Sequence, residues 1–233
     1  MTNDHGGVWN RSELGRERVK DSPYYTEAED SRRGAWHDRE IITRDTSINR
    51  GVYLGGNERE AIVVDDTREE SREIYERVFQ SVQEAVAQRE QKGEQKKSVL
   101  LPVVYDITRR EIPYDEFGTE ELLKKLFGSN LEDQKIDLTY FIEHHTGVCR
   151  QQVLLAGYLI ERLIANGDLR GRVSIDRNSI PNMGAHTWVR YTSHSGKVFI
   201  LDATRGYLGS LEDSAKKGTW IYSRPDDPVL PYR

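Results

Sequence analysis

An apolar stretch that runs from Val153 to Ile164 constrains the fold more than any other feature of this chain. Surface helices carry a polar face, and this stretch has too few polar side chains to provide one. We therefore expect a helix that is buried on most sides. Asn166 and Gly167 are residue types that commonly end helices, and they follow the stretch closely. Other elements must pack around such a helix.

The single cysteine of the chain, Cys149, lies just before this expected helix. At a helix N-terminus, unpaired backbone N–H groups and the positive end of the helix macrodipole stabilise a thiolate. A lone cysteine is more often a small buried apolar residue, so its position alone does not establish reactivity. One cysteine cannot form an internal disulfide, which fits a reducing compartment. We interpret Cys149 as a candidate nucleophile.

Composition divides the 233 residues into one domain and less regular ends. Because 36% of the residues are hydrophobic and 31% are charged, part of the chain is expected to lie outside the core. Residues 1–54 are polar without a sustained period, which predicts a poorly ordered N-terminal arm. We expect the domain over 55–220 and a proline-rich, irregular C-terminal tail over 221–233.

Charge and hydropathy exclude several classes of partner. The net charge is −5 with both signs mixed along the chain, so neither nucleic acid nor an anionic membrane is an expected partner. The first residues lack the apolar segment of a signal peptide, and no stretch has the length of a membrane span. The chain is therefore expected to be cytoplasmic. Its oligomeric state stays open.

Patterns before Cys149 predict both helices and strands. Thr67 and Glu70 have the spacing of a capping box, and apolar residues then recur at every fourth position, which predicts a helix over 67–92. Pro102 indicates that the β-prone segment 99–105 is an edge strand or a packed loop. Shorter patterns predict a strand at 62–64 and helices at 119–127 and 138–144. After Cys149, another short pattern predicts a strand at 172–175.

After the apolar helix, the β-prone segments 185–192 and 197–201 flank a four-residue loop that contains glycine, which predicts a hairpin. If the hairpin closes around His194, His186 and Asp202 lie opposite each other, because each is eight residues from His194. Side chains of such cross-strand partners share a face, with Cβ atoms about 4.5 to 5.5 Å apart. The sequence therefore predicts a histidine–carboxylate hydrogen bond, provided that this register holds.

Together, Cys149, His186 and Asp202 have the residue types of a nucleophile, a base and an orienting carboxylate. The thiol would attack a carbonyl carbon, and the imidazole would hold the thiolate and then protonate the leaving amine. The carboxylate would fix the imidazole tautomer. The backbone N–H of Cys149 is the expected first donor to the developing oxyanion. These roles predict acyl transfer without a metal or cofactor.

Three sequence blocks resemble those of the transglutaminase-like superfamily, and they cover about residues 138–209. The blocks are Gly147-Val148-Cys149-Arg150, Gly184-Ala185-His186-Thr187-Trp188-Val189 and Leu201-Asp202-Ala203-Thr204. The resemblance implies an α+β fold of the papain-like type, in which the cysteine-bearing helix packs on an antiparallel sheet. It also implies the catalytic triad of Cys149, His186 and Asp202. Members include transglutaminases, peptidases, amidases, deamidases and copies without catalysis.

Two positions depart from that pattern. Ala203 stands where proline is common in the family, which a strand end tolerates. Glu143 stands where papain-type proteases have a glutamine that donates to the oxyanion, and an ionised carboxylate cannot donate. Papain-type peptide hydrolysis is therefore not implied. A second oxyanion donor is left to Tyr140, His144 or His145.

Several other residues have simpler interpretations. Trp188 is expected to be a core aromatic rather than a wall of the substrate cleft. Arg150 is expected at the surface. The adjacent pair His144 and His145 lacks a third ligand at a suitable spacing, so no metal site is expected.

The expected function is thiol-dependent acyl transfer on an amide of a protein or peptide, through a covalent acyl-enzyme that water resolves. Such an enzyme is a cysteine peptidase, an amidase or a glutamine deamidase. Two alternatives stay open: a protein-glutamine transglutaminase, in which an amine resolves the same intermediate, and a noncatalytic interaction domain that retains the fold.

Overall fold

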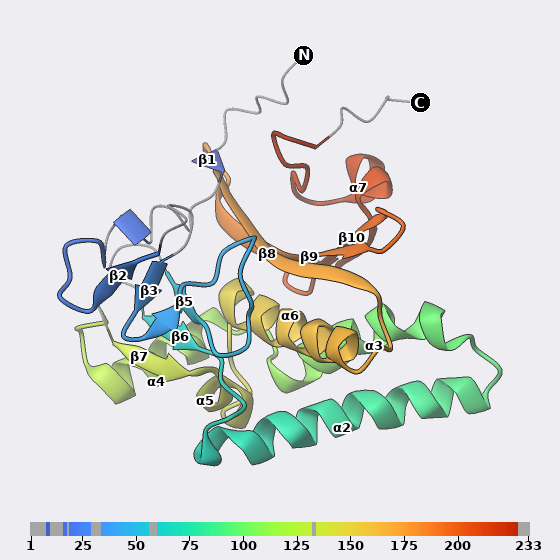
Figure 1. Ribbon diagram of the computed structural model, residues 1–233, viewed down its shortest axis with the longest axis horizontal. Coiled ribbons are helices and arrows are strands. Elements are labelled where there is room, and N and C mark those ends of the chain that lie inside the picture. Colours follow the sequence, from blue (N-terminus) through green and yellow to red (C-terminus); the bar gives the residue numbers. More distant parts are fainter. Residues whose placement is uncertain are drawn as a thin grey trace.

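A computed structural model describes residues 8–9, 16–17, 19–28, 34–55, 60–131 and 134–227, which form a mixed α and β structure (Figure 1). Its largest sheet has five antiparallel strands in the order β1-β8-β9-β10-β11. The strand bounds are Val8–Trp9, Gly171–Ile180, Gly184–Ser193, Val198–Asp202 and Tyr207–Ser210. The expected hairpin is confirmed as β9 and β10, and the strand expected at 172–175 is the longer β8.

Helix α6, Cys149–Ala165, confirms the expected buried helix and begins at the cysteine. It packs on β8 and β9, with helix α3 (Lys96–Glu111) on another side (Figure 1). Leu154, Tyr158 and Leu159 are fully buried in the main core. The helix ends at Asn166, and Gly167 takes a left-handed φ of 81° that favours glycine.

The opposite face of the large sheet is covered by the C-terminal segment. Alternation along the strands directs Trp188 and Ile200 to this face, where they form a second core with Trp220 and Tyr222. Helix α7, Leu211–Lys217, precedes the covering segment. Residues 221–227 are irregular, as expected for the tail, and lie against the sheet; residues 228–233 lie outside the described part of the chain.

The hairpin register differs from the expected one. Val198 pairs with Thr192 and Leu201 with Val189, so the hairpin is centred one residue later than His194. The partner of Asp202 in this register is Trp188, and His186 lies two residues before Trp188 in β9. Because side chains alternate with a period of two, this difference keeps His186 and Asp202 on the same face. They meet diagonally.

The segment expected as an edge strand or loop, 99–105, is part of helix α3, so that expectation is wrong. Pro102 lies inside this helix, where it removes one backbone hydrogen bond. Val99, Val103 and Val104 are buried in the main core at helical spacing. Tertiary burial of this face therefore outweighs both the β-propensity of the segment and the cost of proline.

The remaining helices match their expected positions closely. Helix α2 spans Glu69–Gln91, α4 spans Glu116–Phe127 and α5 spans Leu138–Glu143. The prediction of a capping box at the start of α2 is wrong: the N-cap residue is Arg68, and its side chain makes no capping hydrogen bond. Thr67 instead donates its hydroxyl to Asp65 at 2.6 Å. Among the described residues, no helix is both long and apolar enough to cross a bilayer.

Described residues of the expected N-terminal arm contribute to the core, which differs from the expectation. Ile42 and Ile48 pack in the main core, and Trp36 is 1% exposed. Strands β2 (Tyr25–Glu27), β3 (Gly34–Trp36) and β4 (Arg39–Glu40) form one small sheet. Strands β5 (Val52–Leu54), β6 (Ala61–Val63) and β7 (Lys135–Asp137) form another, and β6 is the strand expected at 62–64. Residues 1–7, 10–15, 18 and 29–33 of the arm lie outside the described part.

Candidate active site

Cys149 is the first residue of α6 and is partly exposed. The turn before it is tightly packed: a Cβ at Gly147 would collide with the side chain of Ile112. The Gly147 carbonyl accepts the backbone N–H of Asp115 at 2.9 Å, which ties this turn to the segment before α4. As the first helical residue, Cys149 has a backbone N–H without an intrahelical acceptor. That N–H can donate to an oxygen of a molecule bound at the thiol.

His186 and Asp202 form the predicted hydrogen bond, with 2.6 Å between Nε2 and Oδ2. Both are buried, at 5% and 1% exposure. The same Oδ2 accepts the hydroxyl of Tyr222 at 2.8 Å, and Oδ1 accepts the backbone N–H of Arg205 at 3.0 Å. Three donors therefore hold this carboxylate in one orientation, and the imidazole is fixed through its Nε2 atom.

The Cys149 side chain also influences the titration of His186. Burial by itself lowers the pKa of His186, but interactions with Asp202 and Cys149, through hydrogen bonding and through charge, raise it to about 9. An imidazole with such a pKa is cationic at neutral pH. The three residues singled out from the sequence are thus brought together, and His186 interacts with both the carboxylate and the thiol.

Trp220 covers the imidazole, with 5.2 Å between the two ring centroids and a nearly edge-on arrangement. Its indole Nε1 donates to Oδ1 of Asn178 at 2.6 Å, and Asn178 is the β8 residue opposite His186. This tryptophan shields the hydrogen bond between His186 and Asp202 from water. The sequence did not single out Trp220 or Tyr222, because both lie in a segment without periodicity. Trp188 is fully buried, which confirms that it is a core aromatic.

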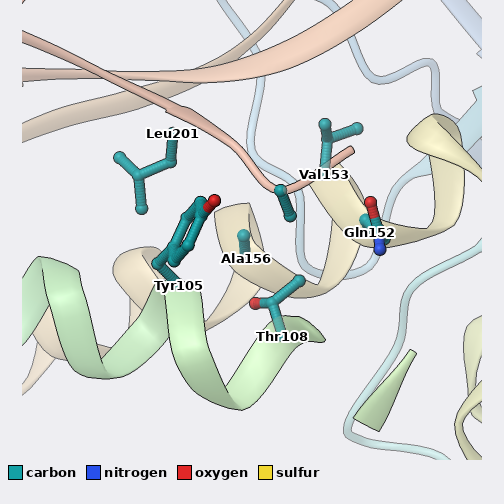
Figure 2. A pocket seen from close by; sticks show the side chains of 7 residues that line it. Tyr105, Thr108, Gln152, Val153, Ala156 and Leu201 are labelled. Atoms are coloured by element: carbon teal, nitrogen blue, oxygen red, sulfur yellow. The ribbon is translucent and has the colours of Figure 1, made fainter. Parts of the chain in front are cut away.

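A hydrogen bond between Thr204 and Gln152 joins the loop after Asp202 to the helix that carries Cys149. The Thr204 hydroxyl donates to Oε1 of Gln152 at 2.7 Å, and Nε2 of Gln152 donates to the Ile112 carbonyl at 2.9 Å. A hollow beside this link opens between α3, α6 and the end of β10 (Figure 2). It is too narrow for a water molecule, and it is lined by Tyr105, Thr108, Gln152, Val153, Ala156, Leu201 and Ala203. The link therefore positions the site rather than binding a ligand.

Arg150 is not a surface residue, which corrects the sequence-based expectation. Its side chain is 12% exposed and its Nε donates to Oε1 of the fully buried Glu60 at 2.6 Å. The same Oε1 accepts Nε2 of Gln151 at 3.0 Å, and Oε1 of Gln151 accepts the backbone N–H of Val148 at 3.0 Å. Glu60 thus holds the first turn of α6 in place through two neighbouring side chains.

The three candidates for a second oxyanion donor have no described contact with Cys149. Tyr140 is 43% exposed, and its ring stacks on that of His144. Nδ1 of His144 is hydrogen-bonded to the Tyr140 carbonyl oxygen at 2.8 Å. His145 and Glu143 are exposed. No group of three or more histidine, cysteine, aspartate or glutamate side chains within the described ranges has the geometry of a metal site.

Comparisons of the chain with protein-family models, with curated proteins and with solved structures found no match.

Proposed function

We propose that this protein is a thiol-dependent acyl-transfer enzyme that acts on amide bonds and has a transglutaminase-like, papain-type fold. One observation carries the proposal: His186 is hydrogen-bonded to the Asp202 carboxylate at 2.6 Å and interacts with the side chain of Cys149, the first residue of α6. Each residue type in this order has the position that its chemical role requires. A helix on an antiparallel sheet, with the three blocks in the same chain order, supports the family assignment.

The geometry suggests how the reaction proceeds. The Cys149 thiolate, paired with the His186 imidazolium, attacks the amide carbonyl carbon, and the backbone N–H of Cys149 faces the developing oxyanion. The imidazolium then protonates the leaving amine, and a thioester remains. Water, deprotonated by the now neutral imidazole, attacks the thioester and releases a carboxylate and the free thiol. Asp202 keeps its hydrogen bond to Nε2 throughout, so Nδ1 carries the proton transfers.

Transfer to water can be tested with a mixture of peptides from a digest of denatured protein, incubated with the enzyme in water enriched in oxygen-18. We expect new product carboxylates that carry one heavy oxygen, because water resolves the acyl-enzyme, and we expect Cys149→Ala to produce none. Mass spectrometry measures both. Adding glycine methyl ester identifies an amine acceptor: products that carry the ester instead of heavy oxygen would support the transglutaminase alternative. Absence of any Cys149-dependent product would argue against the enzyme.

The titration of His186 is expected to depend on Asp202. The pKa of His186 is raised to about 9, so the imidazolium persists through neutral pH and is lost only as the pH rises past 9. Replacing Asp202→Asn removes a negative charge and an ionic hydrogen bond, so the His186 pKa should fall by at least about one unit. NMR titration of the histidine ring carbons measures this value. His194→Ala, which removes an exposed loop histidine, is the control that should leave the titration of His186 unchanged. A wild-type His186 that titrates near pH 6.5 would contradict the prediction.

A further inference from the structure

Arg205 lies beside the proposed catalytic residues. Its guanidinium stacks on Trp220, with 4.1 Å from Cζ to the ring centroid, and Trp220 in turn covers His186. Its backbone N–H donates to Asp202. Because Arg205 directly follows the loop residue that is linked to α6 through Gln152, its backbone is held in a defined position.

The charge of Arg205 also acts on a tyrosine beside the turn that precedes Cys149. Tyr114, which is 51% exposed, pairs through its backbone with Gly147 in the turn before Cys149. Burial raises the pKa of Tyr114, the negative charge of Cys149 raises it further, and the positive charge of Arg205 lowers it. The segment that pairs with the turn before Cys149 therefore lies within the electrostatic range of the Arg205 guanidinium.

The Arg205 guanidinium has no carboxylate partner among the described residues, in contrast to Arg150, which is bound to Glu60. Its Nε atom is enclosed and has no hydrogen-bond acceptor in the described part of the chain. A planar guanidinium can instead bind a carboxylate through its two Nη atoms, with two parallel hydrogen bonds. The unpaired donor and the aromatic support are typical of a recognition site for an anion.

We propose that Arg205 binds a carboxylate of the substrate, so that the enzyme selects amides that lie next to a negative charge. This inference rests on the proposed function, since it names the substrate class of the same site. A carboxylate near a scissile amide comes either from an aspartate or glutamate side chain or from the C-terminus of a peptide. Arg205 thereby determines specificity and takes no part in the proton transfers.

Three matched affinity reagents test this selection: bromoacetyl-glutamine amide, which is neutral, bromoacetyl-glutamate amide, with a side-chain carboxylate, and bromoacetyl-glutamine, with a terminal one. In each, the Cys149 thiolate forms a carbon–sulfur bond and bromide leaves with the bonding electrons. We expect one charged reagent to alkylate Cys149 about fivefold faster than the neutral reagent, the gain that a partly exposed ion pair provides. The faster reagent identifies the source of the carboxylate.

The rate ratio of charged to neutral reagent, measured by intact mass spectrometry, should fall to about one in Arg205→Gln and should be retained in part in Arg205→Lys. Arg109→Gln is the matched control, because Arg109 also stacks on an aromatic ring, that of Tyr105, at 5.6 Å. It should keep the wild-type ratio. Equal wild-type rates for all three reagents, or an advantage that survives Arg205→Gln, would overturn the inference. His186-dependent alkylation by the neutral reagent would still stand in either case, so failure of the proposed function is recognised separately.

Discussion

In the His186→Ala variant, the rate at which iodoacetamide alkylates Cys149 is expected to fall about 100-fold between pH 8.5 and pH 6. An unpaired thiol has a pKa of about 8.5, so its reactive thiolate fraction drops by roughly that factor over this range. Under the proposed mechanism, the imidazolium of His186 holds the thiolate in an ion pair in the wild type. The wild-type rate should therefore change less than about threefold over the same interval. Intact mass spectrometry of quenched samples gives both rates.

Comparing each protein with itself at two pH values removes the difference in intrinsic nucleophilicity between an ion-paired and a free thiolate. His194→Ala is the matched control, because it removes an exposed histidine from the loop between β9 and β10. It should retain the flat wild-type profile. If the wild type and His186→Ala lose reactivity in parallel as the pH falls, the three residues do not form a catalytic unit. A noncatalytic interaction domain would then be the better interpretation.

Arg224→Ala is expected to lower the free energy of unfolding by about 3 kcal/mol, because it removes the hydrogen-bonded cation of the buried Asp176 and leaves that carboxylate with the more distant Arg190, at 3.9 Å. Arg224 donates Nε to Oδ2 of Asp176 at 2.8 Å and Nη2 to the hydroxyl of Ser174 at 2.9 Å. The side chains of Arg224 and Asp176 are 9% and 2% exposed. This ion pair holds the irregular C-terminal segment on the sheet. Urea unfolding followed by circular dichroism measures the loss.

Arg44→Ala provides the comparison, since Arg44 pairs with Asp226 of the same segment at 3.4 Å but at an exposed position. That substitution should cost less than about 1 kcal/mol. Similar losses in the two variants would show that burial of the Arg224 pair does not matter. The same segment carries Trp220 and Tyr222, so we also expect Arg224→Ala to weaken the cover of His186.

Local patterns predicted the elements that carry the site. Helix α6 followed from a continuous apolar stretch, and its first residue is Cys149 as expected. The β9–β10 hairpin followed from two β-prone segments and a glycine-containing loop, and it brought His186 to Asp202. The register itself was wrong, because loop conformation sets it. The predicted contact between His186 and Asp202 still forms, because a register shift of two residues leaves each side chain on the same face of its strand.

Long-range packing decided what these patterns did not contain. Segment 99–105 is helical, despite Pro102, because its apolar face is buried in the main core. Residues 34–54 were expected outside the domain because they are polar on average, yet a few of their side chains, such as Ile48, fill the core. The average composition of a segment does not show which of its scattered apolar side chains pack into the core and which stay exposed.

By itself, the sequence determined the elements that hold Cys149, His186 and Asp202 and made these residues candidates for nucleophile, base and carboxylate, since residue types and periodicity are local properties. Tertiary structure alone decided what surrounds them. Glu60 is held against Arg150 and Gln151 across 90 or more residues of chain. Trp220 and Arg205 meet beside His186 because the C-terminal segment folds back over the sheet. Contacts of this kind depend on burial and on charge pairing between segments that are distant along the chain. The residues involved recur at no fixed spacing, so a single sequence does not show which of them pair.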